Sequence, residues 1–203
     1  MANASIKRLL APPDYKPNPR KWVFWRDSFI YFWVFSLIGH LFEFPWISLM
    51  NAIGQNLPYP PLVAIAIPYG FGVLGILWFV YPILKKKNWG PVMAFILSAV
   101  VCTAIEFVCA LVIYLIYGHN VFWDYSHDFA NLFGFICLKN SLAFGAVALL
   151  FIYVLFPLMD RLMTKLGQIK LNIIFWILFG GYILIHLFAL ILTGDVNGQI
   201  IQL

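Results

Sequence analysis

Five long apolar runs divide the chain, and short polar stretches separate them. A helix needs about 20 apolar residues to cross a bilayer, and inside lipid its backbone groups must bond within the segment. Each run therefore predicts a transmembrane helix. The predicted spans one to five cover residues 28–50, 62–84, 91–117, 138–158 and 172–193. The expected fold class is all-α, a polytopic membrane helix bundle of about five transmembrane helices.

Composition agrees with this pattern. The chain is 63% hydrophobic and 10% charged, whereas soluble domains are about 25% charged and under 50% apolar. These figures exclude a disordered chain, a disulfide scaffold and a water-soluble enzyme with a conventional surface. Cys102 and Cys109 lie about 10 Å apart along one predicted helix, too far to form a disulfide. We expect all three cysteines to be buried thiols.

The basic residues predict the orientation, because loops facing the cytoplasm are enriched in Lys and Arg. An amino terminus inside the cell places twelve of the 13 Lys and Arg residues on the cytoplasmic side. The exception is Lys139, and the predicted outer loops 51–61 and 118–137 contain neither residue type. We therefore predict a multi-pass cell-membrane protein with its amino terminus in the cytoplasm and its carboxyl terminus outside.

This orientation predicts a basic cytoplasmic segment, residues 1–27, followed by a single transmembrane helical domain, residues 28–203, with an outer loop or lid at 118–140. The first segment is too polar to be a signal peptide. The net charge of +5 is explained by topology. The expected partners are the lipid bilayer and a small solute, without nucleic acid.

Spans two and four align without gaps, so that residues 69–82 lie over residues 144–157. In this alignment Gly70 meets Gly145, Leu74 meets Leu149 and Pro82 meets Pro157. The preceding spans, one and three, each carry one glutamate. The pattern indicates a parallel repeat of two helix hairpins, spans 1–2 and 3–4, which is one way in which transporters build a central site. The alternative is that any two apolar helices share a few Gly and Leu residues.

Glu43 in span one and Glu106 in span three are the costly residues, because a charged carboxylate in hydrocarbon costs at least about 2.5 kcal/mol. His40 lies one turn before Glu43, and His186 lies in the outer half of span five. We expect these four side chains to face a polar interior. The alternative is a purely structural role, in which the polar pairs hold helices together.

The loop between spans three and four is rich in hydrogen-bonding side chains. It predicts either a lid or re-entrant segment, or an outer cap with a helix N-cap at Asp124 or Ser126. The candidate substrate-binding residues are His40, Glu43, Glu106, Trp123, Asp124, Tyr125, Ser126, His127, Asn131, Lys139, Asn140 and His186.

The same loop carries a family resemblance. Phe122-Trp-Asp-Tyr-Ser126, followed by Asn131-Leu-Phe-Gly-Phe-Ile-Cys-Leu138, resembles the signature of the CmpB-like family of bacterial membrane proteins, named as ABC-transporter permeases of type IV. Further similar segments are Ile38–Glu43, Pro68–Gly72 and Thr103–Glu106, and Phe135 stands where the family pattern has an arginine. The resemblance implies a permease-like subunit. Because the sequence has no Walker A loop, any ATPase would be a separate subunit.

Three hypotheses for function follow, and the first is favoured. It is a solute-binding or transport subunit whose outward-facing acidic pocket accepts a cation, an amine or a polyhydroxyl compound, with aromatic side chains stacking on the ligand. The second is an intramembrane metal-dependent hydrolase with His40, Glu43 and His186 as candidate metal ligands, although no H-E-x-x-H or G-x-S-x-G motif is present. The third is a non-catalytic structural or immunity partner. The sequence identifies no cofactor, and it leaves a homo-oligomer open.

Overall fold

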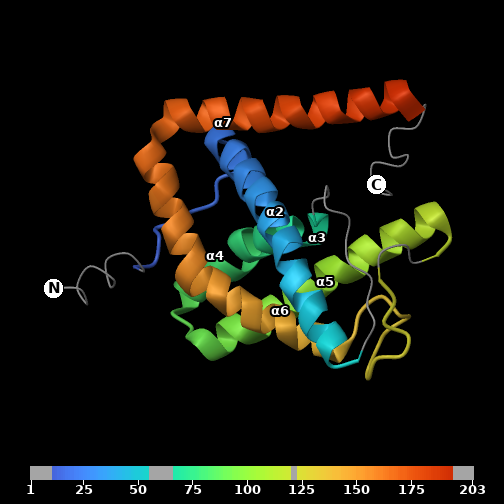
Figure 1. The fold of residues 1–203 in the computed structure, drawn as a ribbon. Helices are drawn as coiled ribbons and strands as arrows, with labels where there is room; N and C mark the ends of the chain where they lie inside the picture. The colour runs from blue at the N-terminus through green and yellow to red at the C-terminus, as the bar shows by residue number, and fades with distance from the viewer. Residues whose placement is uncertain (1–10, 55–65, 120–122, 194–203) are drawn as a thin grey trace. The chain divides into compact units, whose positions relative to one another are not determined.

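The computed structural model describes residues 11–54, 66–119 and 123–193, with side chains described as far as residue 184. Within these ranges the chain is helical, without a strand and with one isolated bridge between Leu132 and Ile136. The elements in chain order are α2 (Trp22–Ala52), α3 (Ile67–Gly75), η1 (Ile76–Val80), α4 (Tyr81–Lys87), α5 (Pro91–Tyr117), α6 (Leu138–Leu150), η2 (Phe151–Leu155) and α7 (Phe156–Thr193) (Figure 1). The predicted all-α fold is confirmed.

Four helical stretches among the described residues are long and apolar enough to cross a membrane: Trp22–Ala52, Ile67–Lys87, Pro91–Tyr117 and Leu138–Leu184. The first three correspond to predicted spans one to three. The fourth has 47 residues, about 70 Å of helix, which is more than twice the hydrocarbon thickness of about 30 Å. It covers predicted span four and most of predicted span five. Its helical geometry is interrupted at Gly167, where φ is 74° and ψ is 167°.

Helix α5 shows how the local sequence sets the ends of a span. It begins at Pro91, whose missing amide hydrogen costs nothing at the first helical position. It ends at Gly118, which has φ of 75° and closes the last turn through a bond from its amide to the carbonyl of Tyr114. The predicted bounds of span three, 91–117, are therefore those of the helix.

Two π-helices, η1 and η2, lie inside the second and fourth stretches. After one intervening residue, each is followed by a proline: Pro82 after η1 and Pro157 after η2. A proline in a helix has no amide hydrogen, and its ring clashes with the carbonyl four residues earlier. A wider π turn just before the proline accommodates that mismatch while the chain remains helical.

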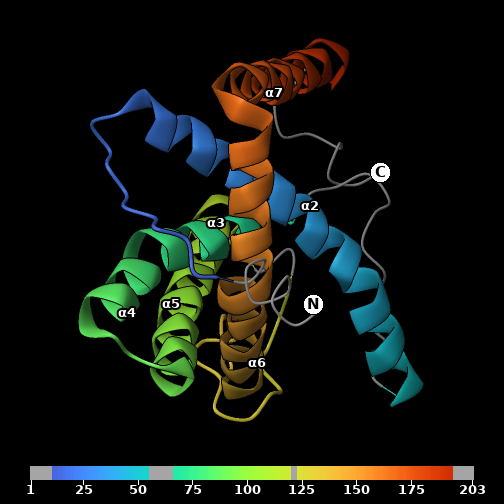
Figure 2. The same cartoon turned by 90° about the vertical axis from the view of Figure 1, so that its left-hand side faces the viewer.

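The described chain forms two compact units: Met1–Arg20 with Phe71–Gly167, and Lys21–Gly70 with Gln168–Leu203. In the first unit, α5 and α6 lie side by side (Figures 1 and 2). They approach closely at Gly145, where an added methyl group would come within 2.8 Å of the Phe95 ring. Ala94, Ala110 and Ala148 are also buried, so small side chains allow this close packing.

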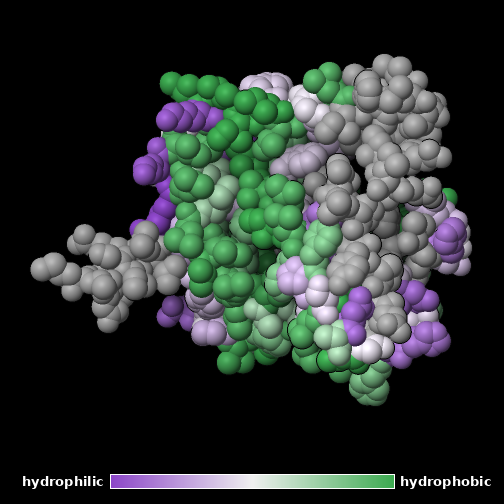
Figure 3. All heavy atoms as spheres, viewed as in Figure 1, coloured by the Kyte–Doolittle hydropathy of each residue, from purple (hydrophilic) through white to green (hydrophobic). Residues whose placement is uncertain are grey.

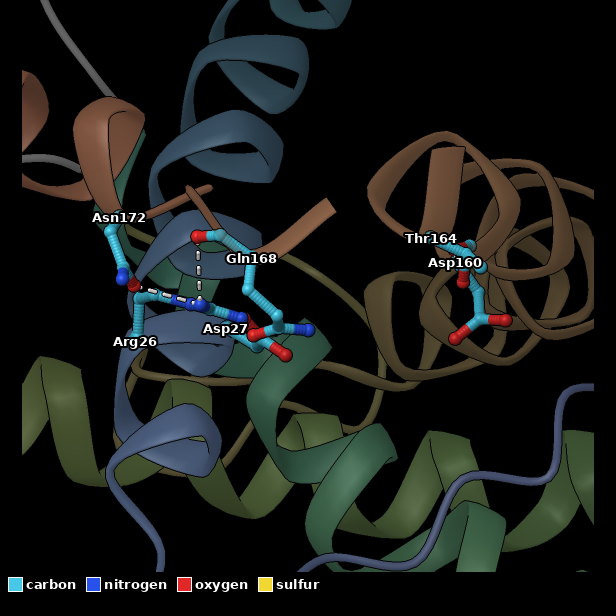
Figure 4. Close-up of polar contacts among 6 residues, drawn as sticks. All are labelled: Arg26, Asp27, Asp160, Thr164, Gln168 and Asn172. Atoms are coloured by element: carbon cyan, nitrogen blue, oxygen red, sulfur yellow. Dashed lines mark hydrogen bonds and ion pairs between the residues drawn. The ribbon is translucent and has the colours of Figure 1, made fainter. Parts of the chain in front are cut away.

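In the second unit, a buried arginine joins the first and last helices. The guanidinium of Arg26 is 1% exposed, and it donates to the Asn172 Oδ1 at 2.8 Å and to the Gln168 carbonyl at 3.4 Å (Figure 4). It also forms an ion pair with the carboxylate of Asp27 at 2.6 Å. A buried guanidinium is tolerated only when it is paired and hydrogen-bonded in this way.

Aromatic contacts continue along the same two helices. Trp22 packs edge-on against Phe175, with ring centroids 4.9 Å apart, and Trp33 packs against Tyr182 at 5.4 Å. Phe29 lies between these levels and contacts Phe175. These contacts join the first half of α2 to the part of α7 that follows Gly167.

Apolar side chains cover much of the molecular surface, as Figure 3 shows for one face. Val92 is 73% exposed, Leu115 74% and Ile169 78%. Exposed apolar area on this scale would be unfavourable in water, and it fits contact with lipid tails.

Candidate functional site

The centre of the candidate site is a carboxylate in the second half of α5, within the first unit. Glu106 is 6% exposed. The Tyr125 hydroxyl, from the loop that follows α5, donates a hydrogen bond to its Oε1 at 3.1 Å. The second oxygen, Oε2, is buried and has no hydrogen-bond partner among the described residues. The site therefore holds one acceptor that is satisfied and one that can still accept.

The loop that delivers Tyr125 is folded by its own polar side chains. The Asp124 carboxylate accepts bonds from the amide of Ser126, at 2.9 Å, and from its hydroxyl. The Asn131 side chain donates to the carbonyls of Ser126 at 3.1 Å and Asp128 at 3.0 Å. The suggested helix N-cap at Asp124 or Ser126 is wrong, because α6 begins only at Leu138 and Asp124 closes a turn instead.

Gly134 lets the loop fold back on itself. Its φ is 70°, and an added methyl group would lie 2.8 Å from the Asp124 carboxylate. Its carbonyl accepts from the Tyr125 amide at 2.9 Å, which fixes the backbone of the residue that reaches Glu106. Ala130 and Phe133 also have positive φ, so three left-handed residues give this loop its shape.

An aromatic cluster lies beside these turns. The Trp123 indole donates to the Phe135 carbonyl at 3.0 Å. The buried Phe135 ring contacts Phe107 and Tyr114 of α5, with centroids 5.7 and 5.5 Å apart. Phe135 therefore anchors the loop to α5 through apolar contact.

The end of the loop is fixed by a salt bridge between Lys139 and Asp128, with a nitrogen–oxygen distance of 2.9 Å. The other Asp128 oxygen lies 3.8 Å from the Cys137 thiol. Lys139, the one basic residue on the predicted outer side, thus pairs with an acid of its own loop. The three cysteines are free thiols; Cys137 is buried as expected, but Cys102 and Cys109 are half-buried because α5 leaves them partly uncovered.

Loop titrations follow from these surroundings. Burial raises the pKa of the Tyr125 phenol above its ordinary value of 10.0; the nearby Glu106 charge raises it further, and Asn140 acts in the opposite direction. The phenol therefore remains a donor. Hydrogen bonds from the Ser126 side chain and amide hold the pKa of Asp124 below its usual range.

A second polar group lies in the other unit, on α2. The His40 Nδ1 is 3.9 Å from the Glu43 Oε2, one turn apart. His40 is 3% exposed, and its Nε2 has no hydrogen-bond partner within the described part of the chain, as is also true of the Ser36 hydroxyl. Gly39 is in close contact with Tyr69 of α3. This face of α2 is therefore packed and polar.

The structure thus brings together Glu106, Tyr125 and their supporting loop. Trp123, Asp124, Ser126, Asn131 and Lys139 build the loop, and His127 is exposed. His40 and Glu43 belong to the other unit, and the His186 side chain lies outside the described residues, so their grouping with Glu106 stays a prediction. No three His, Cys, Asp or Glu side chains form a metal-holding group within the described ranges.

Sequence reasoning missed two functional details. It did not identify Asp128 as the partner of Lys139, nor Gly134 as the residue that allows the turn. The spacing Asn131-Leu-Phe-Gly134 carried a signal for the second, because Asn and Gly are typical turn residues.

Several long apolar helices among the described residues define the class, a multi-pass membrane protein. The family model described as "Putative ABC-transporter type IV" matches residues 30–190, and the chain belongs to this family. No curated protein and no solved structure matches the chain.

Proposed function

We propose that this chain is the membrane-embedded, solute-binding or transport subunit of a permease, with its binding site at Glu106 beneath the loop at 118–140. The observation that carries the proposal is the Tyr125–Glu106 hydrogen bond, which leaves Glu106 Oε2 buried and without a partner among the described residues. A buried acceptor of this kind costs free energy until a ligand, water or ion supplies a donor. The loop acts as a lid because Tyr125 is its contact with that acid.

Five spans with a cytoplasmic amino terminus are the proposed topology. The length of the fourth helical stretch supports it, since 47 residues make about 70 Å of helix, more than twice the hydrocarbon thickness of about 30 Å. A break at Gly167 divides the last stretch where the predicted cytoplasmic loop between spans four and five lies. The loop at 118–140 then faces outward, and residues 1–27 precede a single membrane domain, residues 28–203.

The repeat of two hairpins has support in the positions of the π-helices. From Ile76 to Phe151 their first residues are 75 positions apart. The aligned pairs Gly70 and Gly145, and Pro82 and Pro157, have the same separation. An irregular element thus recurs at the position that the sequence alignment assigns to it.

Helix contacts within each hairpin give independent support. An added methyl group at Gly70 would lie 2.6 Å from Phe32, and one at Gly145 would lie 2.8 Å from Phe95. Phe32 and Phe95 are 63 positions apart, and so are Glu43 and Glu106. The same offset of 63 positions therefore relates span one to span three, both for the phenylalanine at the helix contact and for the glutamate.

The proposed solute is a small cation, amine or polyhydroxyl compound. A free carboxylate oxygen accepts from ammonium or hydroxyl donors, and Phe107, Trp123 and Tyr125 supply aromatic surface for a cation. For His40, Glu43 and His186, a part in solute binding stays a prediction from the sequence. Energy would come from a separate ATPase subunit, consistent with the family to which the chain belongs.

Ligand-induced thermal stabilisation tests the proposal. The purified protein in nanodiscs is screened with tetramethylammonium, spermidine and glucose, alongside Glu106→Gln, Glu43→Gln and the control Asp160→Asn, which removes a carboxylate on α7. We expect at least one probe to raise the unfolding temperature of the wild type and of Asp160→Asn, and Glu106→Gln to abolish the shift. An unchanged ligand response in both glutamate variants would rule the site out.

A non-catalytic partner is the second candidate, and one observation favours it. Most polar side chains of the loop bond within the loop itself, as expected of a purely structural cap. In that case Glu106→Gln lowers stability, and none of the probes stabilises any variant.

A further inference from the structure

A segment ahead of the first span lies along the ends of two other helices in the first unit. The Tyr15 ring meets Tyr81 of α4 edge-on, with centroids 6.4 Å apart, and meets Phe156 of α7 at 5.6 Å. Tyr81 and Phe156 also contact each other at 4.9 Å. The three rings form one cluster, which Tyr15 joins from the amino-terminal side.

Polar contacts fix the same segment to α4. The Pro13 carbonyl accepts from the Tyr81 hydroxyl and from the Lys85 ammonium, both at 2.8 Å. Lys85 also lies 3.3 Å from the Asp14 carboxylate. Asp14 is the single acidic residue among the first 20 residues, whose other charged side chains are Lys and Arg. It therefore gives a basic segment an attractive contact with a basic helix end.

Tyr81 and Phe156 occupy a special place in their helices. Each directly follows a π-helix, η1 or η2, and directly precedes a proline. π-helices are rare in proteins, and a proline removes one backbone hydrogen bond. A helix therefore bends most easily at these points. Tyr15 therefore contacts both helices just beyond their weakest backbone.

The segment is also well suited to bind as a strap. Pro12, Pro13, Pro17 and Pro19 restrict its backbone. A restricted chain loses less conformational entropy on docking than a flexible one. Few contacts can then hold it in place.

We infer that residues 13–16 form an intramolecular clamp, which holds the ends of α4 and α7 together and keeps η1 and η2 from bending. Release of this strap lets the two helix ends separate. The device is independent of the ligand at Glu106, because it rests on contacts of the amino-terminal segment alone.

Distances between two spin labels, measured by pulsed electron–electron double resonance, test the clamp. The labels replace Ile83 and Leu158, which are 43% and 41% exposed and follow the two prolines directly. The chain of 203 residues carries alanine at its three cysteines and is reconstituted in nanodiscs. Two releasing variants, Tyr15→Ala and Lys85→Gln, are compared with Tyr15→Phe, which keeps the ring. The matched control is Lys87→Gln, since Lys87 is exposed and makes no ion pair with any described residue.

We expect one narrow distance distribution in the parent, in Tyr15→Phe and in Lys87→Gln, and a broader distribution shifted to longer distance in both releasing variants. Parent-like distributions in Lys85→Gln and Tyr15→Ala overturn the clamp, and so does equal broadening in Lys87→Gln. If Tyr15→Ala fails to fold, Lys85→Gln decides, because Lys85 is partly exposed and its replacement leaves the ring cluster in place.

Discussion

A carboxylate among apolar helices must find hydrogen-bond donors, and Glu106 finds one outside its own span. The sequence predicts the cost of this residue, because a glutamate in the third apolar run stands out. It also predicts that the Trp123–Ser126 motif matters. It does not predict which loop side chain reaches the acid, because the shape of the loop depends on positive φ angles at Ala130 and Phe133. Residues other than glycine seldom adopt such angles.

Removing the Tyr125 hydroxyl tests this contact. Tyr125→Phe leaves Glu106 Oε1 buried without its donor, so we expect it to destabilise the fold by about 1–3 kcal/mol. Chemical unfolding in detergent measures the loss. Tyr114→Phe is the matched control, because Tyr114 lies on the same helix as Glu106 and is 44% exposed. A double-mutant cycle with Glu106→Gln should show coupling, and additive effects would contradict the contact.

The Tyr125 phenol should also titrate late. Its pKa is raised in the folded chain, chiefly by burial, so the folded state keeps this proton where the unfolded state has lost it. The resulting stability is fully present below about pH 10 and is lost as the pH rises through the folded pKa. Subtracting the ultraviolet titration of Tyr125→Phe from that of the wild type isolates this phenol. We expect little phenolate from Tyr125 at pH 10. Half-ionisation of this phenol at pH 10 would contradict a raised pKa.

Elements in this chain are set by a few residues whose backbone chemistry is unusual. The apolar runs predict the helices, and Pro91 and Gly118 fix the ends of α5. The π-helices could not be predicted in the same way, because Pro82 and Pro157 are equally compatible with a kink or a helix end. Both prolines instead follow a π turn within a continuous helical stretch.

The loop after α5 should depend on Gly134 more than on another left-handed glycine. Gly134→Ala adds a methyl group 2.8 Å from the Asp124 carboxylate at φ of 70°, whereas Gly118→Ala adds one at φ of 75° with no described residue within 4 Å. Both variants incur the left-handed cost of about 1–2 kcal/mol. Only Gly134→Ala adds a steric clash, so we expect it to lose more stability in urea unfolding. Equal losses would show that the loop does not close tightly on Asp124.

At the scale of the whole molecule, sequence and structure contribute different parts of the picture. Lys and Arg positions predict the orientation in the membrane. The structure adds the aromatic contacts between α2 and the last part of α7, made by Trp22, Trp33 and their partners, which no pattern along one helix contains. The sequence could not predict Arg26 as a buried link, because its place in a basic cluster suggests an exposed residue.

The two sources together make the number of crossings testable. In a background without native cysteines, single cysteines replace His119, Asp195, Lys87 and Lys170, and intact cells are treated with a membrane-impermeant maleimide. With five spans and a cytoplasmic amino terminus, His119→Cys and Asp195→Cys label from outside, and the two lysine variants label only after permeabilisation. Asp195→Cys decides between the alternatives. If the helical stretch from Leu138 to Leu184 crossed only once, Asp195 would lie on the same side as Lys87, and its labelling would require permeabilisation.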